Sequence, residues 1–215
     1  MILHIYLNMA SFIGAMPSSA FTVDYENKIV TLNSTLDATG FYFGSTIKLS
    51  DGWTFDGNYN RVINLPANYS GFIDPINITS SGGITIKNII FDGPTVGGYA
   101  GARDAGFVFR TSPIFFTVEN CGIINMSVDS QATADAAGFG GTLTKLGTFN
   151  NCFVAGELNG NNVGGFVGWQ SEDLSFNNCY NLCNLYGSGG FTASHCKLIT
   201  FNNCYNYGTI NNWGS

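Results

Sequence analysis

Four sulfur- and nitrogen-bearing side chains in the C-terminal part of the sequence could bind a transition metal. They are Cys179, Cys183, His195 and Cys196. Thiolate and imidazole groups at short spacings are the ligands that zinc favours in tetrahedral sites. Against zinc, Cys179 belongs to a repeat described below, and Cys183 follows it at a spacing that the repeat does not explain. We therefore expect neither a metal nor another cofactor.

A group of acidic and basic residues is the best candidate for catalysis. Asp92, Arg103, Asp104 and Arg110 lie near one another in the sequence and could line one face of the protein. Paired carboxylates at a suitable separation hydrolyse glycosidic bonds. An aspartate that precedes a glycine, as Asp92 precedes Gly93, more often makes a turn. We favour the turn, so whether the chain is an enzyme stays open, with the balance toward a non-enzymatic protein.

The composition favours strands broken by tight turns over helices. Of the 215 residues, 28 are Gly and 25 are Asn, and both tolerate the left-handed backbone that sharp turns need. Only 10% are charged, and the net charge of −6 gives no basic surface for nucleic acid. No apolar run after the N-terminal segment is long enough for a transmembrane helix. We expect no nucleic acid partner and no membrane span.

Internal repetition is the strongest signal in the sequence. One pattern, Thr/Ser-Phe-Asn-Asn-Cys-aromatic, occurs three times, with a divergent copy before them, at residues 117–122, 148–153, 175–180 and 200–205. A second pattern, built on Gly-Phe, alternates with the first, at residues 105–108, 137–140, 164–168 and 189–192. The cysteines of successive copies are 31, 27 and 25 residues apart, which is enough for three short strands and three bends.

These repeats predict an all-β protein made of a single parallel β-helix, or β-solenoid. One coil cannot bury its inner face alone, and its neighbours above and below complete the burial. We expect roughly seven coils over residues 21–215, with the clearest repeats at 117–213. Phe at the same position of each coil would stack in the interior, and Asn at a bend would bond the Asn amide of the next coil.

The spacing of the repeat predicts a bend at each Asn-Asn pair. Phe149 and Cys152 are three residues apart, so a straight strand would place them on opposite faces. Both can point inward only if the chain bends at Asn150-Asn151, and Asn takes such a bend at low cost. The same argument predicts bends at Asn177-Asn178 and at Asn202-Asn203.

All six cysteines lie in the second half of the chain, and two interpretations are open for them. An even count admits disulfides in a secreted protein. Stacked coils lie about 4.8 Å apart, which is within the range of a disulfide. Because four of the cysteines recur with the repeat, we favour a column of small buried apolar side chains.

The first twenty residues are apolar and also admit two interpretations. Ser18 and Ala20 have the spacing of a signal-peptide cleavage site. The segment contains no Lys or Arg, however, and His4 and Asn8 interrupt its apolar run. We favour a retained segment, residues 1–20, that caps the first coil, because an uncapped solenoid exposes an apolar edge.

The combination of Phe-Asn-Asn-Cys-Tyr/Phe with Gly-Gly-Phe-x-Gly resembles the GLUG-type repeats of β-solenoid proteins from large DNA viruses and bacterial surface adhesins. The resemblance covers residues 117–213, whereas the earlier half is similar only to parallel β-helices in general, as in Trp53–Asn58. The low charge, the many Asn residues and the cysteines look more like a viral protein than an adhesin. The resemblance implies a right-handed parallel β-helix in a virion or at an extracellular or cell surface.

The resemblance leaves three functions open, of which we favour the first. This is a non-enzymatic structural or interaction solenoid, such as a virion surface, capsid-associated or fibre component. Its partners would be other virion or surface proteins, or itself in a homo-oligomer such as a trimer. The second is an adhesin or glycan-binding solenoid with a row of exposed aromatic side chains, for which the candidates are Trp53, Tyr59, Tyr99 and Trp169. The third is a polysaccharide hydrolase or lyase using the Asp92 to Arg110 region.

Overall fold

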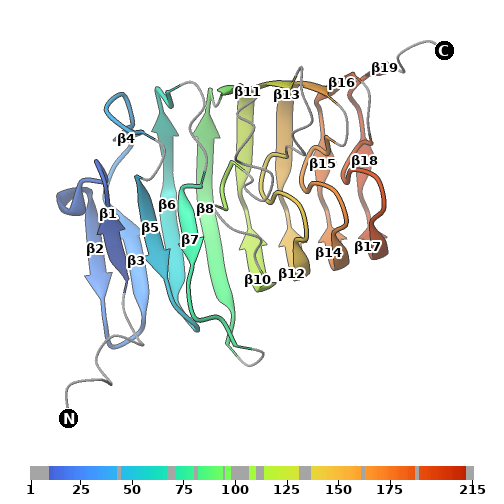
Figure 1. Ribbon diagram of the computed structural model, residues 1–215. Helices are drawn as coiled ribbons and strands as arrows, with labels where there is room; N and C mark the ends of the chain where they lie inside the picture. Colours follow the sequence, from blue (N-terminus) through green and yellow to red (C-terminus); the bar gives the residue numbers. More distant parts are fainter. Residues whose placement is uncertain are drawn as a thin grey trace.

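The protein is a parallel β-solenoid, as the repeats predict, and it has about five turns (Figure 1). The computed structural model describes residues 10–42, 45–66, 71–79, 82–93, 95–97, 107–109, 114–130, 137–160, 163–186 and 189–211. Within these residues the structure is all-β apart from one short 3-10 helix, η2 (Ser18–Ala20). The predicted fold class is therefore confirmed.

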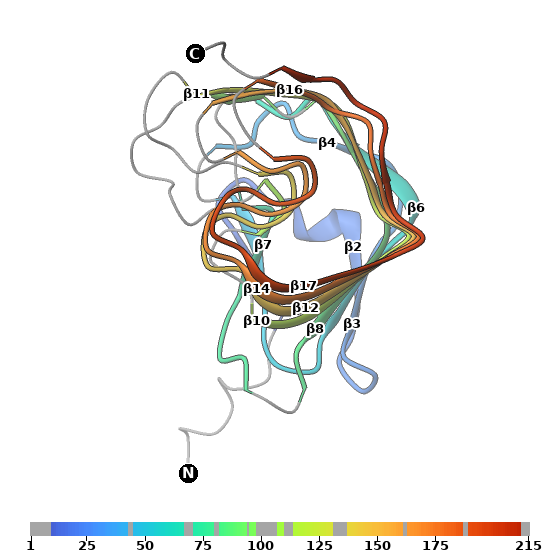
Figure 2. The same ribbon diagram turned by 90° about the vertical axis from the view of Figure 1, so that its right-hand side faces the viewer.

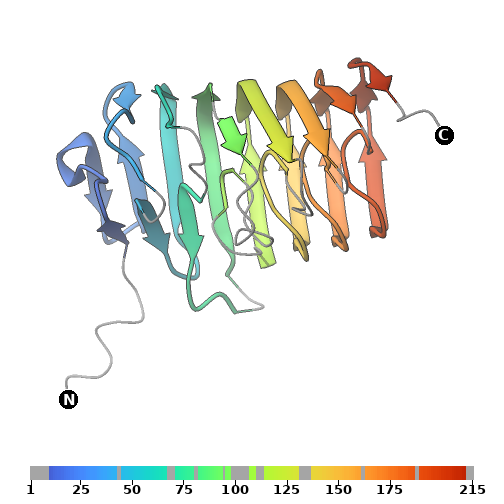
Figure 3. The same ribbon diagram turned by 45° about the horizontal axis from the view of Figure 1, so that its top comes forward.

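Two parallel walls make up most of each coil, and each coil adds its strands beside those of the coil before (Figures 1 and 3). The first wall contains β3 (Ile29–Leu32), β6 (Thr54–Ile63), β8 (Ile84–Asp92), β10 (Ile114–Glu119), β12 (Lys145–Asn150), β14 (Glu172–Asn177) and β17 (Lys197–Asn202). The second wall contains β4 (Leu36–Asp37), the later parts of β6 and β8, β9 (Thr95–Gly97), β11 (Gly122–Ser130), β13 (Phe153–Gly160), β15 (Tyr180–Asn181), β16 (Asn184–Tyr186), β18 (Tyr205–Asn206) and β19 (Ile210–Asn211).

A third side closes each coil. In the N-terminal half it is a small sheet in which β5 (Thr46–Leu49) and β7 (Ile73–Pro75) pair in parallel. In the C-terminal half the Gly-Phe repeats form it through isolated parallel bridges, such as those that join Ala137 to Gly164 and Val167 to Thr192. Figure 2, a view along the stack, shows the two walls and the third side around one interior.

The register between coils superimposes the sequence repeats. Phe149 pairs with Phe176, and Phe176 pairs with Phe201. The rings of these residues stack with centroids 4.9 Å and 5.2 Å apart. A second column from the Gly-Phe repeats, Phe139, Phe166 and Phe191, stacks at 5.5 Å and 5.0 Å. Rings of the two columns meet edge to face, so the interior is a continuous aromatic core.

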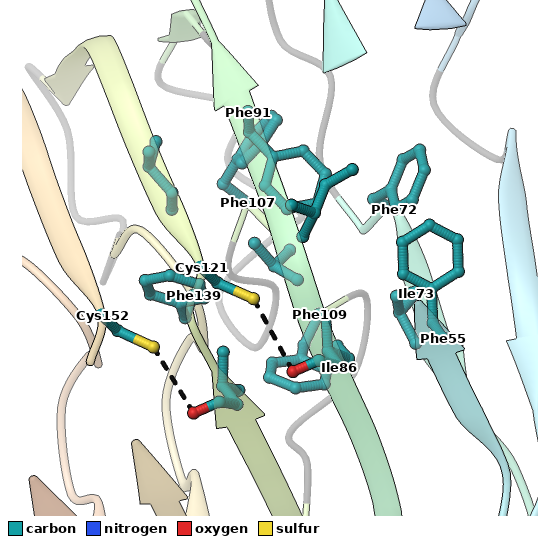
Figure 4. Close-up of a cluster of buried hydrophobic side chains, with 14 of the residues drawn as sticks. Phe55, Phe72, Ile73, Ile86, Phe91, Phe107, Phe109, Cys121, Phe139 and Cys152 are labelled. Atoms are coloured by element: carbon teal, nitrogen blue, oxygen red, sulfur yellow. Dashed lines mark hydrogen bonds between the residues drawn. The ribbon is translucent and has the colours of Figure 1, made fainter. Parts of the chain in front are cut away.

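The core of the N-terminal half is also aromatic, but its residues do not repeat at fixed positions. Phe55, Phe72, Phe91 and Phe107 follow one another with edge-to-face contacts at 5.5, 5.1 and 5.4 Å (Figure 4). All four are buried. This irregular order explains why the sequence repeats are hard to detect before residue 117.

Each Asn-Asn pair of the repeat lies at a bend between the two walls, as predicted. The second Asn has a left-handed backbone, with φ of 52° at Asn178 and 53° at Asn151 and Asn203. Phe149 and Cys152, on either side of one bend, both have no exposed surface. The bend therefore allows residues three apart to point into the same core.

Two details of the predicted repeat are wrong. The coil count is about five instead of seven. Residues 21–24 form β2 (Phe21–Asp24), which pairs antiparallel with β3 and is not part of a parallel coil. The early Gly-Phe copy is displaced, because Phe109 and not Phe107 donates its N–H to the Phe139 carbonyl.

Antiparallel strands cover the N-terminal end of the described core. β1 (Ser11–Ile13) pairs with β5, and β2 pairs with β3. Met16 and Phe21 are buried there, and the Phe12 ring stacks on Phe21 at 4.9 Å. Residues 1–9 of the predicted capping segment lie outside the described residues.

Candidate functional site

The structure places Asp92, the one described member of the candidate catalytic group, in contacts between coils. Its carboxylate pairs with the Arg61 guanidinium at 2.7 Å and accepts a hydrogen bond from Asn125 Nδ2 at 2.7 Å. Gly93 follows with φ of +76°, which is the turn expected of an Asp-Gly pair. The other three candidates, Arg103, Asp104 and Arg110, lie outside the described residues.

Two further aspartates also link neighbouring coils. Asp51 accepts hydrogen bonds from Thr79 Oγ1 and the Gly83 N–H, both at 2.6 Å, and the bond from Thr79 is the main cause that lowers its pKa. For Asp56, burial alone would raise the pKa, but bonds from the Asn58 N–H and the Asn88 side chain outweigh it. Lowered pKa values keep these carboxylates ionised, whereas the general acid of a glycosidase needs a raised one.

The four candidate zinc ligands do not form a site. The Cys179 thiol donates to the Phe149 carbonyl in the core at 3.5 Å, and Cys183 is fully buried. His195 is exposed in a turn before β17, where its Nδ1 accepts from Trp169 Nε1–H at 2.9 Å. The Cys196 thiol donates to the Gly168 carbonyl at 3.5 Å. In the part of the chain that the structure describes, no group of three or more His, Cys, Asp or Glu residues could hold a metal.

Cys121, Cys152, Cys179 and Cys204 form the column that the repeat suggested, and all six cysteines of the chain are free thiols. Cys121 and Cys152 point into the core and donate to the carbonyls of Ile86 and Val118 on the preceding coil (Figure 4). Burial raises the pKa of the Cys152 thiol well above its ordinary value, and it raises that of Cys183 to about 12. Because the thiolate is the reactive form, these residues are chemically inert in the folded protein.

We therefore predict that a thiol reagent at mildly alkaline pH will modify Cys196 and Cys204 first, because only these two are partly exposed. Peptide mass mapping at successive times would measure the order. Cys121, Cys152, Cys179 and Cys183 should react only when denaturant is added. Modification of Cys152 in the native protein as fast as Cys204 would contradict the buried column.

Of the described aromatic residues that were candidates for an exposed row, Tyr59 lies on the surface, with 77% of it exposed. Trp53 is buried at 1%, and Trp169 is half-buried. Tyr99 lies outside the described residues. The predicted set was therefore wrong for Trp53, whose inward position places it among the core side chains.

A different row of aromatic side chains lies on the outside of the second wall, directly after the bends. This aromatic row consists of Phe153, Tyr180 and Tyr205, which are paired in register on successive coils. Phe153 and Tyr180 are half-buried, Tyr205 is 50% exposed, and the two tyrosine rings are 4.4 Å apart. The sequence carried the signal, because an aromatic residue follows the cysteine in three of the four repeats.

An unbroken ladder of side-chain hydrogen bonds runs beside the aromatic row. This asparagine ladder consists of Asn88, Asn120, Asn151, Asn178 and Asn203. Each Nδ2 donates to the Oδ1 of the asparagine on the preceding coil, at 3.1, 3.1, 3.2 and 2.8 Å in order along the chain. At the N-terminal end, Asn88 donates to Asp56 Oδ1 at 3.1 Å. The ladder confirms the expected pairing of bend asparagines between coils.

A shallow groove of about 230 Å³ joins the ladder to the row. Its lining contains no charged side chain and consists of Tyr59, Asn60, Asn88, Ile89, Ile90, Asn120, Asn151 and Phe153. Phe153 lies over Gly122, where a Cβ atom would come within 2.4 Å of the ring. Glycine at 122 therefore leaves room for the Phe153 ring. We call the ladder, the row and this groove together the polar–aromatic strip.

Comparison of the chain with protein-family models, with curated proteins and with solved structures finds no match. Across the described ranges, no helix is long and apolar enough to cross a membrane. The polar–aromatic strip is therefore the candidate functional site on geometric grounds alone.

Proposed function

We propose that this protein is a non-enzymatic structural or interaction β-solenoid that is displayed on a surface and binds partners through its side. The polar–aromatic strip carries this proposal. It repeats once per coil, contains no charge and lies outside the core. An aromatic patch with hydrogen-bonding groups at its edge is a common composition for an interaction surface.

An enzymatic function has less support than a non-enzymatic one. The described carboxylates Asp51, Asp56 and Asp92 are all engaged in bonds between coils. A polysaccharide hydrolase or lyase would need carboxylates that can reach a substrate. The aspartates therefore act as parts of the scaffold in our proposal.

The setting we propose is the surface of a virion, with the chain as a surface, capsid-associated or fibre component. The GLUG-type pattern at residues 117–213 and the low charge support this setting by resemblance. Its partners would be other virion or surface proteins, or further copies of the chain in a homo-oligomer. A cell-surface adhesin is the second setting, and the strip would serve the same purpose there.

An antibody against the purified protein tests the setting. We expect it to label intact virions or cells of the source without permeabilisation. A matched sample opened with detergent serves as the control for buried antigen. Labelling only after disruption would contradict surface display. Release of reducing ends from a polysaccharide by the purified protein, abolished by Asp92→Asn, would contradict the non-enzymatic assignment.

A further inference from the structure

We propose that the polar–aromatic strip is a binding site for a neutral glycan, which lies along the solenoid and crosses several coils. This inference rests on the proposed function, because it names the ligand class of the same surface. It follows from the hydrogen-bonding capacity of the ladder, from its rigidity, from the neighbouring rings and from the absence of charge.

The bonds of the ladder use only half of the hydrogen-bond donors and acceptors of its inner asparagine side chains. An asparagine amide has two N–H donors and two acceptor lone pairs. In Asn120, Asn151 and Asn178, the ladder occupies one donor and one acceptor. All three residues are exposed. Each coil therefore presents one N–H and one lone pair side by side, which matches a hydroxyl group because a hydroxyl both donates and accepts.

The ladder also fixes these groups before any ligand arrives. Asn151 is held by bonds to the coils on both sides, at 3.1 and 3.2 Å, and by a left-handed backbone with φ of 53°. A free asparagine side chain would lose rotamer freedom on binding, at a cost of about 0.5–1.5 kcal/mol for an immobilised side chain. In the ladder that ordering is already complete, so weak hydroxyl contacts can add up along the strip.

The aromatic row supplies the apolar part of the site. The faces of a pyranose ring carry C–H groups, which pack well on an aromatic ring. Phe153 and Tyr180 are half-buried, and they stand one coil apart. Coils are spaced by about 4.8 Å, which is close to the length of one sugar unit in an extended chain. The row can therefore contact successive units.

The absence of charge selects a neutral ligand. No Asp, Glu, Lys or Arg lines the groove. Asp56, which accepts from Asn88 at the N-terminal end of the ladder, is paired with Lys87 at 3.3 Å, and Arg61 is paired with Asp92 at 2.7 Å. A sulfated or uronic acid polymer would find no cation here to compensate for its desolvation. Binding to the strip should consequently depend little on ionic strength.

Titration of the full-length protein with neutral oligosaccharides tests the proposal. The probes are hexasaccharides of β-1,4-linked glucose, N-acetylglucosamine, xylose and mannose, and of α-1,4-linked glucose, with calorimetric detection. We expect at least one to bind, with an affinity that is unchanged on addition of salt. The double variant Phe153→Ala with Tyr180→Ala should weaken that binding by roughly tenfold or more.

Two variants separate the site from the fold. Asn151→Gly removes one amide but permits the left-handed bend, so it should weaken binding in a protein that still folds, with a thermal midpoint lowered by the loss of two ladder bonds. Thr148→Ala changes an outward side chain of the same coil on the first wall and should leave binding intact. Equal affinity of the folded strip variants and the wild type would overturn the proposal.

The test also distinguishes this inference from the proposed function. Surface labelling of intact particles together with no binding of any neutral hexasaccharide would refute the glycan site and leave the interaction solenoid standing. Binding that is lost when salt is added would contradict the proposal that the ligand is neutral. Cleavage of a bound hexasaccharide would refute the non-enzymatic function and not the site.

Discussion

Replacing Phe176 by alanine is expected to lower the free energy of unfolding by about 3–5 kcal/mol, the usual cost of truncating a buried phenylalanine. The side chain has no exposed surface, and its ring stacks between Phe149 at 4.9 Å and Phe201 at 5.2 Å. It also meets Phe166 and Phe191 edge to face at 5.4 Å. The cavity would interrupt both aromatic columns. Urea denaturation followed by circular dichroism measures the change.

Phe201→Ala is the matched control for this prediction. Phe201 belongs to the same column but is 50% exposed on the last coil of the first wall. Its truncation removes less buried surface, so a loss of about 1–2 kcal/mol is expected. A loss as large as that of Phe176→Ala would show that Phe201 is covered in solution. Such a result would contradict the exposed end that the structure describes.

Asn151→Ala is expected to destabilise the protein by about 2–3 kcal/mol, through the backbone and the ladder together. Alanine in the left-handed region costs about 1–2 kcal/mol, because its Cβ approaches the following carbonyl. Two ladder bonds, to Asn120 and from Asn178, are lost as well. Exposed bonds of this kind contribute at the lower end of about 0.5–1.5 kcal/mol each. Urea midpoints measure the total.

Two comparisons separate the backbone contribution from the ladder contribution. Asn151→Gly keeps the bend without strain and should be more stable than Asn151→Ala by about 1 kcal/mol. Asn203→Ala has the same backbone strain, with φ of 53°, but removes only the one ladder bond to Asn178. It should cost less than Asn151→Ala. If glycine proved no better than alanine at residue 151, the left-handed bend would not be the source of strain.

The fold was predictable because its signals are local and repeat along the chain. The copies at residues 148–153, 175–180 and 200–205 differ at only a few positions, so identical residues had to align between coils. The spacing of Phe149 and Cys152 required a bend, and Asn was the residue able to make it. The cysteine column and the asparagine ladder followed from the same alignment.

The candidate sites were less predictable, because nearness in sequence does not determine nearness in a solenoid. Cys179 lies at a bend after the first wall, whereas His195 lies in the turn that precedes β17. The four weak candidates for zinc are therefore held in separate contacts and not around one point. Asp92 meets Arg61 and Asn125, which are 31 and 33 residues away and one coil above or below.

Aromatic exposure was the hardest property to predict. Trp53 directly precedes β6 and Phe153 begins β13, yet the first is buried in the core and the second lines the groove on the outer surface. Each residue after a bend faces in or out according to where the bend lies. In the early coils the register shifts between Asp56 and Asn60. Beyond such a shift, the position of a residue in the sequence no longer indicates whether its side chain faces the core or the solvent.

The sequence by itself determined that the chain stacks upon itself, where it bends and which residues recur in columns. These properties follow from repeats whose members are chemically alike. Only the tertiary structure decided that the bend residues Asn88, Asn120 and Asn151 share one uncharged groove with Tyr59 and Phe153. The physical reason is that this surface is assembled from side chains one coil apart, whose exposure depends on neighbours some thirty residues distant in the chain.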